Sequence, residues 1–377
     1  MDLDLTSEQE LLRDTVRSFA RERVAPVAEE IDRESRFPVE LVREMAELGL
    51  LGIPLPDRYE GAGGDTLGYA IAIEELTRID SSVAITVAAH TSLGTMPIFL
   101  FGSDEQKDRW LPDLASGRRL AAFGLTEPDA GSDAGATRTT AELRDGSWIV
   151  NGSKMFITNA GTELTWGVTI TARTGEDEVS TLVVENGTPG YEISAPLHKL
   201  GWKASDTREL TFADCAVPEE NLLGPRGRGF HQFLEILDGG RISVAAMGVG
   251  LAQGAYDLAF AYAQERKQFG KPIGRFQAVS FKLADMAVEI EAGRQLVHKA
   301  AWLKDQGRSF ALEAAMAKLY TGELSHRVVN HALQIHGGYG FMDEFPISRL
   351  YRDQKILEIG EGTNEVQRMV IAKHLGL

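Results

Sequence analysis

Residues 148–158 read WIVNGSKMFIT, and apolar, aromatic and β-branched side chains occur there in two short runs around an Asn-Gly pair. Such runs are typical of β-strands, and an Asn-Gly pair between them predicts the turn of a hairpin. Similar runs, separated by turn residues, follow at residues 168–171, 181–184 and 210–212. We therefore predict a small β-barrel or sandwich within residues 118–225.

Helical patterns lie on both sides of this segment. Before it, Thr6-Ser7-Glu8-Gln9 offers a capping-box signal, and apolar residues then recur at helical spacing up to Pro26. After Gly224-Pro225 the helical pattern returns in long segments, as in a helix bundle. The sequence thus predicts a mainly α protein with a β middle domain. We place an all-helical domain at 1–117, the β domain at 118–225 and a helical bundle at 226–377.

Length and composition disfavour several classes of protein. A chain of 377 residues exceeds the usual size of one hydrophobic core. Its formal net charge of −16 disfavours nucleic-acid binding, because phosphate recognition relies on an excess of Lys and Arg. The acidic N-terminus lacks the basic and apolar regions of a targeting signal, and we identify no apolar run long enough to cross a bilayer. We expect a cytoplasmic protein without a membrane span.

Common site motifs are missing from the sequence. The chain has no GxxxxGK[ST] loop, HExxH pair, GxSxG elbow or CxxC pair. Cys215 is the only cysteine, which excludes an intrachain disulfide and favours a buried structural thiol. His331 and His336 are five residues apart, so they do not share a helix face, and we expect no metal site. The glycines of GVGLAQG at 248–254 lie in a helical pattern and indicate close helix packing.

Three glycine-rich segments are candidates for a reactive site. They are FGLTEPDAGSDAG at 123–135, QIHGGYGF at 334–341 and EIGEGTNEVQR at 358–368. In the first, turn residues would leave free backbone N–H groups around Ser132. In the third, Glu361 lies between two glycines, and Thr363 is placed to begin a helix whose N–H groups would face an anion or a polar ring. Each segment alone could be a surface loop, but the three in this order are specific.

These segments and three further motifs carry a family resemblance. The further motifs are NGSKMFITNA at 151–160, LDGGRI at 237–242 and ERKQFGKPIGRFQAV at 265–279. With them, the chain resembles the acyl-CoA dehydrogenase family over essentially its whole length, and the short-chain, butyryl-type members most of all. The resemblance implies a helical N-terminal domain, a β middle domain and a C-terminal four-helix bundle. It also implies FAD as cofactor, an acyl-CoA substrate and a homotetramer built as a dimer of dimers.

The same resemblance assigns residues to the flavin. Those similar to contacts of the flavin ring and its chain are Phe123, Leu125, Thr126 and Ser132, with Phe156 and Thr158 covering one face of the ring. Those similar to FAD contacts shared between neighbouring subunits are Arg266, Phe269, Gln277, Gln334, Gly337, Gly338, Thr363 and Glu365. A monomer would then bind FAD incompletely.

Glu361 matches the family's catalytic base. Removal of a weakly acidic α-proton requires such a carboxylate, and burial beside an acyl chain would raise its pKa and strengthen it as a base. Some family members place the base on the LDGGRI helix instead, but that position here is Gly240. The resemblance also implies substrate contacts at Ser132, Asp238, Arg241 and Gly362, with the Arg241 guanidinium suited to the 3′-phosphate or ribose of CoA.

The substrate and the electron acceptor are less narrowly specified. Gly360 stands where the family often has Tyr, which weakens inference about acyl chain length. We favour a short straight-chain acyl-CoA and an electron-transferring flavoprotein as acceptor. Medium-chain or branched-chain dehydrogenases, an acyl-CoA oxidase and a carrier-protein-linked dehydrogenase are the alternatives within catalysis. A non-catalytic flavoprotein is the alternative of a different class, and the intact Glu361 argues against it.

Overall fold

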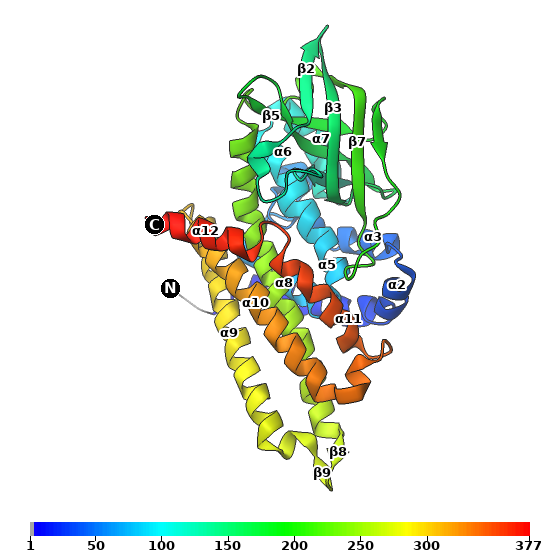
Figure 1. Ribbon diagram of the computed structural model, residues 1–377, viewed down its shortest axis with the longest axis vertical. Helices are drawn as coiled ribbons and strands as arrows, with labels where there is room; N and C mark the ends of the chain where they lie inside the picture. Colours follow the sequence, from blue (N-terminus) through cyan, green and yellow to red (C-terminus); the bar gives the residue numbers. More distant parts are fainter. Residues whose placement is uncertain (1–3) are drawn as a thin grey trace.

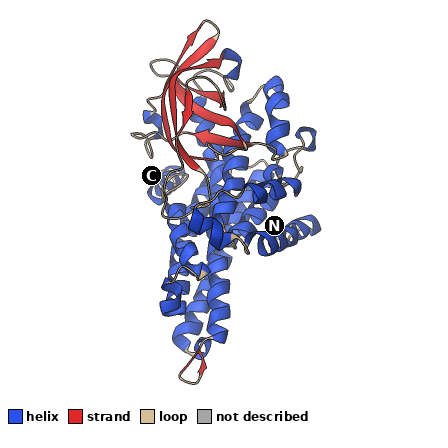
Figure 2. Ribbon diagram, turned by 90° about the vertical axis from the view of Figure 1, so that its right-hand side faces the viewer, coloured by secondary structure: helices blue, strands red, loops and turns tan. Residues whose placement is uncertain are grey.

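The computed structural model describes residues 4–377, which form an elongated body with a β-sheet toward one end and helices through the rest (Figures 1 and 2). The helices before the sheet are α1 Ser7–Phe19, α2 Ala28–Glu34, α3 Val39–Glu47, α4 Thr66–Thr77, α5 Ser81–Ala88, α6 Met96–Phe101 and α7 Asp104–Ala115. Those after it are α8 Gly229–Glu265, α9 Gln277–Asp305, α10 Ala311–His336, α11 Pro346–Asp353 and α12 Asn364–His374. The predicted mainly α fold with a β middle part is confirmed.

The sheet is mixed, and β3 lies at its centre. Its strands are β1 Leu120–Gly124, β2 Thr140–Arg144, β3 Ser147–Thr158, β4 Thr165–Arg173, β5 Val179–Glu185, β6 Tyr191–Ile193 and β7 Thr207–Pro218. Their spatial order within the described residues is β1-β4-β2-β3-β7-β6, with β5 paired to β4. β1 and β4 run parallel, whereas β3 pairs antiparallel with both β2 and β7. A small hairpin of β8 Lys267–Gln268 and β9 Lys271–Pro272 lies at the opposite end of the molecule (Figure 2).

The predicted turn at Asn151-Gly152 is wrong. Strand β3 runs straight through this pair, and the register with β7 shifts between Val150 and Gly152, so the pair forms an irregularity within the strand. The hairpin turn lies earlier, at Asp145-Gly146 between β2 and β3, where both residues have positive φ (49° and 77°). A two-residue turn with positive φ at both positions matches the twist of the flanking strands, and Asp-Gly serves it as well as Asn-Gly.

The helices on either side of the sheet share one hydrophobic core. Buried side chains of α1, α3, α4 and α5 belong to the same cluster as those of α8, α9 and α10. The sheet has a core of its own around Trp148 and Phe212. The first and last helical segments are therefore packed as one body, although the sheet separates them in sequence. We keep the boundaries after residues 117 and 225 as a proposal.

Glycines let α8 approach its neighbours closely, as GVGLAQG predicts. A Cβ on Gly248 would collide with Thr321 of α10. A Cβ on Gly250 or Gly254 would collide with the backbone of Glu74 in α4 or of Arg78 just after it. This stretch is helical throughout. It is a packing seam between helices, as the sequence predicts.

Two helical stretches have the length and apolar composition of a membrane span, contrary to our expectation. They are Ser81–Phe101, with a mean hydropathy of 1.5, and Gly229–Glu265, with 1.2. Of their most apolar windows, 83% and 67% are buried inside the protein. A helix in the core of a large protein is apolar on most sides, which accounts for both stretches.

Gly250→Ala is expected to destabilise the protein, because its new methyl group meets the Glu74 carbonyl across the seam. Overpacking of a core typically costs about 1–3 kcal/mol, which outweighs the helix-propensity gain of about 1 kcal/mol. The matched control on the same helix is Gly239→Ala, whose Cβ meets only the flexible end of Lys304 at 3.1 Å. Thermal midpoints at one protein concentration should fall for Gly250→Ala and stay level or rise for Gly239→Ala; equal midpoints would contradict the close packing.

Candidate active site

Glu361 lies in a strained turn between η9 (Gln354–Glu358) and α12. Its φ is 51°, a left-handed conformation that is costly for a residue with a side chain, and Gly362 follows with φ 86°. Thr363 then caps α12 as predicted, with its hydroxyl accepting a hydrogen bond from the Val366 N–H at 3.3 Å. Glu361 therefore lies outside α12, in the turn that leads into it.

Two side chains hold this turn. The Lys318 ammonium, on α10, donates to the Gly362 carbonyl at 2.8 Å and to Asn364 Oδ1 at 3.2 Å. The Gln367 amide, on α12, donates to the carbonyls of Glu361 at 3.2 Å and Gly362 at 2.9 Å. A left-handed conformation persists where the surroundings impose it, and these four hydrogen bonds are such a constraint.

One oxygen of the Glu361 carboxylate is withdrawn from water. Part of the residue reaches the surface, but Oε2 is buried and has no hydrogen-bond partner. Burial raises the pKa of Glu361 to about 7, and the positive charges of Lys318 and Arg241 oppose that rise. Oε2 lies against Gly240 of α8, where any Cβ would collide with it. Gly240, the second glycine of LDGGRI, therefore makes room for the Glu361 carboxylate, which comes from a distant part of the sequence.

Arg241 is more buried than a ligand for a CoA phosphate would be. Its side chain is 5% exposed and forms an ion pair with Asp238, which is 28% exposed. Burial lowers the pKa of Arg241, while Asp238 and Glu361 raise it. The guanidinium thus lies on the inner side of LDGGRI, in the electrostatic field of Glu361, and Asp238 lies nearer the surface.

The segment 123–135 is anchored by a buried ion pair. Lys154 of β3 donates from Nζ to Glu127 at 2.7 Å, to Thr171 Oγ1 at 3.1 Å and to the Leu125 carbonyl at 3.3 Å. Glu127 in turn accepts hydrogen bonds from the backbone N–H groups of Arg138 and Thr139. The loop that carries Thr126 and Ser132 is therefore fixed to the sheet beneath it.

Around this loop, aromatic rings differ sharply in exposure. Phe123 stacks on Phe233 of α8, with ring centroids 4.1 Å apart. Phe156 instead has φ 64° and is 66% exposed. Leu125, Thr126 and Thr158 are half-buried, and Ser132 is exposed. Residues 4–377 thus leave most of the Phe156 side chain uncovered.

A second group of predicted residues lines a cavity of about 550 Å³ at the other end of the helices. Arg266, Gly337 and Gly338 line it together with Tyr339, over which the Arg266 guanidinium sits 5.5 Å from the ring centroid. A Cβ on Gly337 or Gly338 would meet nothing within 4 Å, so both glycines face open space. Phe269, in the β8–β9 turn, is 93% exposed.

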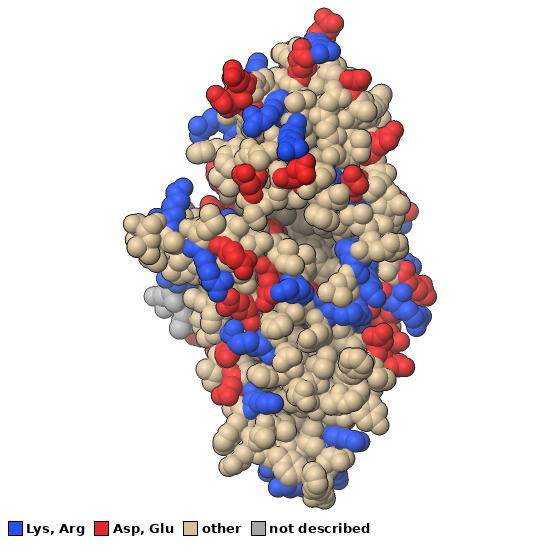
Figure 3. Space-filling model, viewed as in Figure 1, with Lys and Arg blue, Asp and Glu red and all other residues tan. Residues whose placement is uncertain are grey.

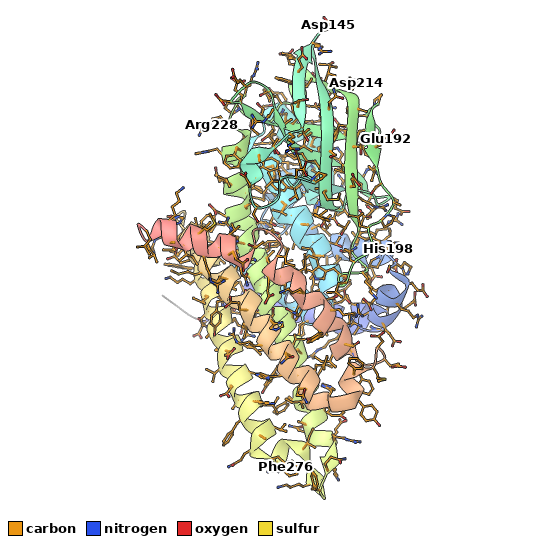
Figure 4. The ribbon with its side chains drawn as sticks, viewed as in Figure 1. Asp145, Glu192, His198, Asp214, Arg228 and Phe276 are labelled. Carbon is orange, nitrogen blue, oxygen red and sulfur yellow. The ribbon has the colours of Figure 1, made fainter. Side chains whose placement is uncertain are left out.

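The structure therefore separates the predicted site residues into two groups. The residues from Phe123 to Thr158 lie on the sheet or in the loop between β1 and β2, and Figure 3 shows a hollow between the sheet and the helices below it. Gln334 lies in the last turn of α10, and Gln277 begins α9 directly after Phe276, which Figure 4 labels at the far end of the bundle. Thr363 and the exposed Glu365 lie beside Glu361, between the two groups. One chain does not bring all of these residues to a single ligand.

Comparison with known proteins decides the family. Models of the acyl-CoA dehydrogenase N-terminal, middle and C-terminal domains match residues 6–118, 122–215 and 227–376. A probable acyl-CoA dehydrogenase of Bacillus subtilis, YngJ, is 50% identical over 380 residues, covering 100% of both chains. This chain belongs to the acyl-CoA dehydrogenase family.

Solved acyl-CoA dehydrogenase structures have the same fold. The butyryl-CoA dehydrogenase of Megasphaera elsdenii is 42% identical with a TM-score of 0.98, and the match covers 100% of both chains. An acyl-CoA dehydrogenase of Bacillus anthracis, complexed with FAD, is 36% identical with a TM-score of 0.94 over 99% of this chain and 67% of that one. The resemblance drawn from the motifs is confirmed, and the protein is an enzyme of this family.

Other features of this acyl-CoA dehydrogenase have structural roles. Cys215 is buried, which raises its thiol pKa to about 11. His336 bonds through Nδ1 to the Ala332 carbonyl and stacks on Tyr262 at 4.5 Å. Across residues 4–377, no group of three or more His, Cys, Asp or Glu side chains is placed to hold a metal ion.

Sequence reasoning missed the residues that support the site. Lys154 and Gln367 lie inside the motifs at 151–160 and 358–368, but nothing in the sequence marks them as supporting residues. Lys318 does carry a recognisable signal, because it interrupts the apolar stripe of AAMAKL at a position that a helix would bury. A lysine on the core face of a helix is rarely retained without a partner.

Lys154→Met is expected to loosen the 123–135 loop, because it leaves Glu127 buried without its cation. Breaking a buried ion pair from one side typically costs about 3–5 kcal/mol. Adding Glu127→Gln should recover part of that loss, since the double variant buries no unpaired charge. Thermal midpoints and protease cleavage within 123–135 measure both effects; a double variant no more stable than Lys154→Met would refute the pairing.

Proposed function

We propose that this enzyme converts a short-chain acyl-CoA to the trans-2-enoyl-CoA with FAD as cofactor, and that Glu361 removes the α-proton. The Glu361 carboxylate carries the proposal. Its Oε2 is buried, has no hydrogen-bond partner, and belongs to a group whose pKa burial raises to about 7. A general base works best when its pKa is near the operating pH, so this carboxylate is suited to proton abstraction at neutral pH.

The chain's own residues account for the proton transfer. The α-proton of a thioester is weakly acidic, so Glu361 must be ionised and oriented before the substrate binds. The turn held by Lys318 and Gln367 supplies the orientation. By analogy with the family, the Glu361 backbone N–H donates a hydrogen bond to the thioester oxygen as negative charge develops there. FAD, when bound, supplies a ring that accepts the hydride from Cβ.

The residues present fit FAD. Phe156 offers an exposed aromatic face to a flat ring, beside the half-buried Thr158. At the far end of the bundle, Arg266 supplies positive charge for a phosphate, and the open faces of Gly337 and Gly338 admit close approach of a ligand to the backbone. Leu125, Thr126, Ser132, Phe269, Gln277, Gln334, Thr363 and Glu365 complete the proposed FAD contacts.

The proposed FAD contacts on the sheet lie apart from those at the far end of the bundle. This separation supports a FAD site shared between subunits. The far end of the bundle exposes several large apolar side chains, among them Phe269, Phe281, Val288 and Phe341. Figure 3 shows few charged side chains over this part of the molecule. Such a surface is typical of an interface, and we propose the homotetramer of the family, in which one subunit's bundle end completes its neighbour's site.

On the CoA side, we propose contacts from Ser132, Asp238 and Gly362, with Arg241 acting through its ion pair with Asp238. Asp238 is the more exposed member of its ion pair, so its carboxylate is placed to accept hydrogen bonds from pantetheine amides. Arg241 then acts by holding Asp238 rather than by reaching the 3′-phosphate. We propose a short acyl chain because this protein is 42% identical to the butyryl-CoA dehydrogenase of Megasphaera elsdenii over its whole length. An electron-transferring flavoprotein is the proposed acceptor, and the cytoplasm the proposed compartment.

Anaerobic titration of the purified enzyme with butyryl-, octanoyl- and isovaleryl-CoA tests the reaction. We expect butyryl-CoA to bleach the flavin absorbance most strongly. Glu361→Gln should keep its yellow colour and bind the same ligands, while bleaching and turnover fall by orders of magnitude. Turnover of the wild type should also decline as the pH falls through about 7, because protonated Glu361 is no base. Near-normal turnover of Glu361→Gln would refute the assignment of the base.

Arg266→Ala is expected to lower flavin content and to weaken assembly together. A hydrogen bond from a charged group contributes about 1.5–3 kcal/mol, so FAD affinity should fall about tenfold or more. Arg275→Ala is the matched control, because Arg275 is exposed in the same segment and does not line the cavity. Flavin-to-protein absorbance ratios and light scattering report the two effects. Unchanged flavin content in Arg266→Ala would contradict the shared site.

A further inference from the structure

Lys318 is a lysine wholly inside the protein. Its exposed fraction is 0%, and it lies on α10 among small and apolar residues. Burying an ammonium group is costly unless specific partners compensate for the lost water. Its hydrogen bonds go to a backbone carbonyl and a side-chain amide oxygen, those of Gly362 and Asn364, rather than to a carboxylate. Its position therefore needs an explanation beyond an ordinary buried ion pair.

Both hydrogen bonds of Lys318 go to the segment that begins α12, directly after Glu361. Gly362 has φ 86° and Glu361 has φ 51°, so two successive residues are held in left-handed conformations. Gln367 supports the same turn from within α12, but its amide is neutral. Of these two side chains, Lys318 is the one that joins the turn to a different helix and brings a charge to it.

Lys318 and Glu361 also act on each other through their opposite charges. Among the groups that raise the pKa of Lys318, Glu361 acts most strongly, and Lys318 in turn is the strongest influence that lowers the pKa of Glu361. The other charged or titratable groups facing this pair are Arg241 of α8, Glu358 of η9, Glu365 of α12 and Tyr69 of α4. Glu358 and Glu365 reach the surface, so the two cations Lys318 and Arg241 are the buried charges that balance the carboxylate.

We propose that Lys318 is a positioning residue of the reaction: its ammonium fixes the strained turn through the Gly362 carbonyl, and its charge keeps Glu361 ionised. This role rests on the proposed function of Glu361 as base. It assigns two separable contributions to one side chain, a hydrogen bond that sets geometry and a positive charge that sets the protonation state.

The sign of the charge effect follows from the electrostatics. Burial raises the pKa of Glu361 to about 7 and lowers that of Lys318 to about 8, and their mutual attraction limits both changes. Removing the ammonium leaves the burial effect on Glu361 unopposed by its strongest partner. The pKa of Glu361 must then rise, and the pH at which half of the base is ionised moves upward. An opposite charge nearby typically changes a carboxyl pKa by about one unit or more.

Two substitutions at Lys318 separate the contributions. Lys318→Met removes donor and charge, whereas Lys318→Gln removes the charge and keeps a donor. Gln367→Met is the matched control, since it removes a neutral donor from the same turn. In each protein, the Glu361 carboxyl is titrated by infrared difference spectroscopy, with Glu361→Gln identifying its band. The pH dependence of kcat/KM with butyryl-CoA is measured in parallel.

We expect Lys318→Met and Lys318→Gln to raise the pKa of the Glu361 carboxyl by about one unit. The pH at the midpoint of the acid limb of kcat/KM should rise by the same amount. At pH 7, Lys318→Met should lose tenfold or more in kcat, and Lys318→Gln less. Gln367→Met should lower kcat but leave the midpoint pH of the acid limb of kcat/KM nearly unchanged. A Glu361 band that titrates as in the wild type in both Lys318 variants would overturn the proposal and leave Lys318 a structural residue. If Glu361→Gln keeps its turnover, the proposed base fails instead, which is a separate outcome.

Discussion

A carboxylate buried without a hydrogen-bond partner is the constraint on which the site depends. Glu361 Oε2 lies against the backbone of Gly240, between the long helix α8 and the start of α12. No side chain fits at position 240 without displacing it. The left-handed turn, its anchoring by Lys318 and the packing of α10 on α8 hold this oxygen in the protein interior. The pKa near neutrality follows from that position.

Charge balance around Glu361 is spread over several helices. Lys318 comes from α10 and Arg241 from α8, and neither makes a hydrogen bond to the carboxylate itself. Partial compensation of this kind keeps a base available, because a direct ion pair would stabilise the ionised form and lower its pKa. The shared core of the first and last helical segments fixes the relative positions of these helices.

The separation of the proposed cofactor residues has a consequence for assembly. The sheet presents Phe156, whereas the bundle end, which lies away from the sheet (Figure 1), presents Phe269 and the cavity beside Arg266. Exposed aromatic side chains are stabilised when another surface covers them. Cofactor binding and association of subunits would then depend on the same residues. A change that weakens cofactor binding would therefore weaken association as well.

The sequence by itself determined the order helix, sheet, helix, the helix start at Thr363, and the motifs that identify the family, because these depend on local periodicity and on residues close together in the chain. The hairpin turn was misplaced because Asn151-Gly152 and Asp145-Gly146 carry similar turn signals, and only pairing across the sheet selects between them. Only the tertiary structure decided that Gly240 faces Glu361 and that Lys318 holds its turn. Those contacts join residues more than forty positions apart, and burial, which sets the pKa of the base, is a property of the packed helices together.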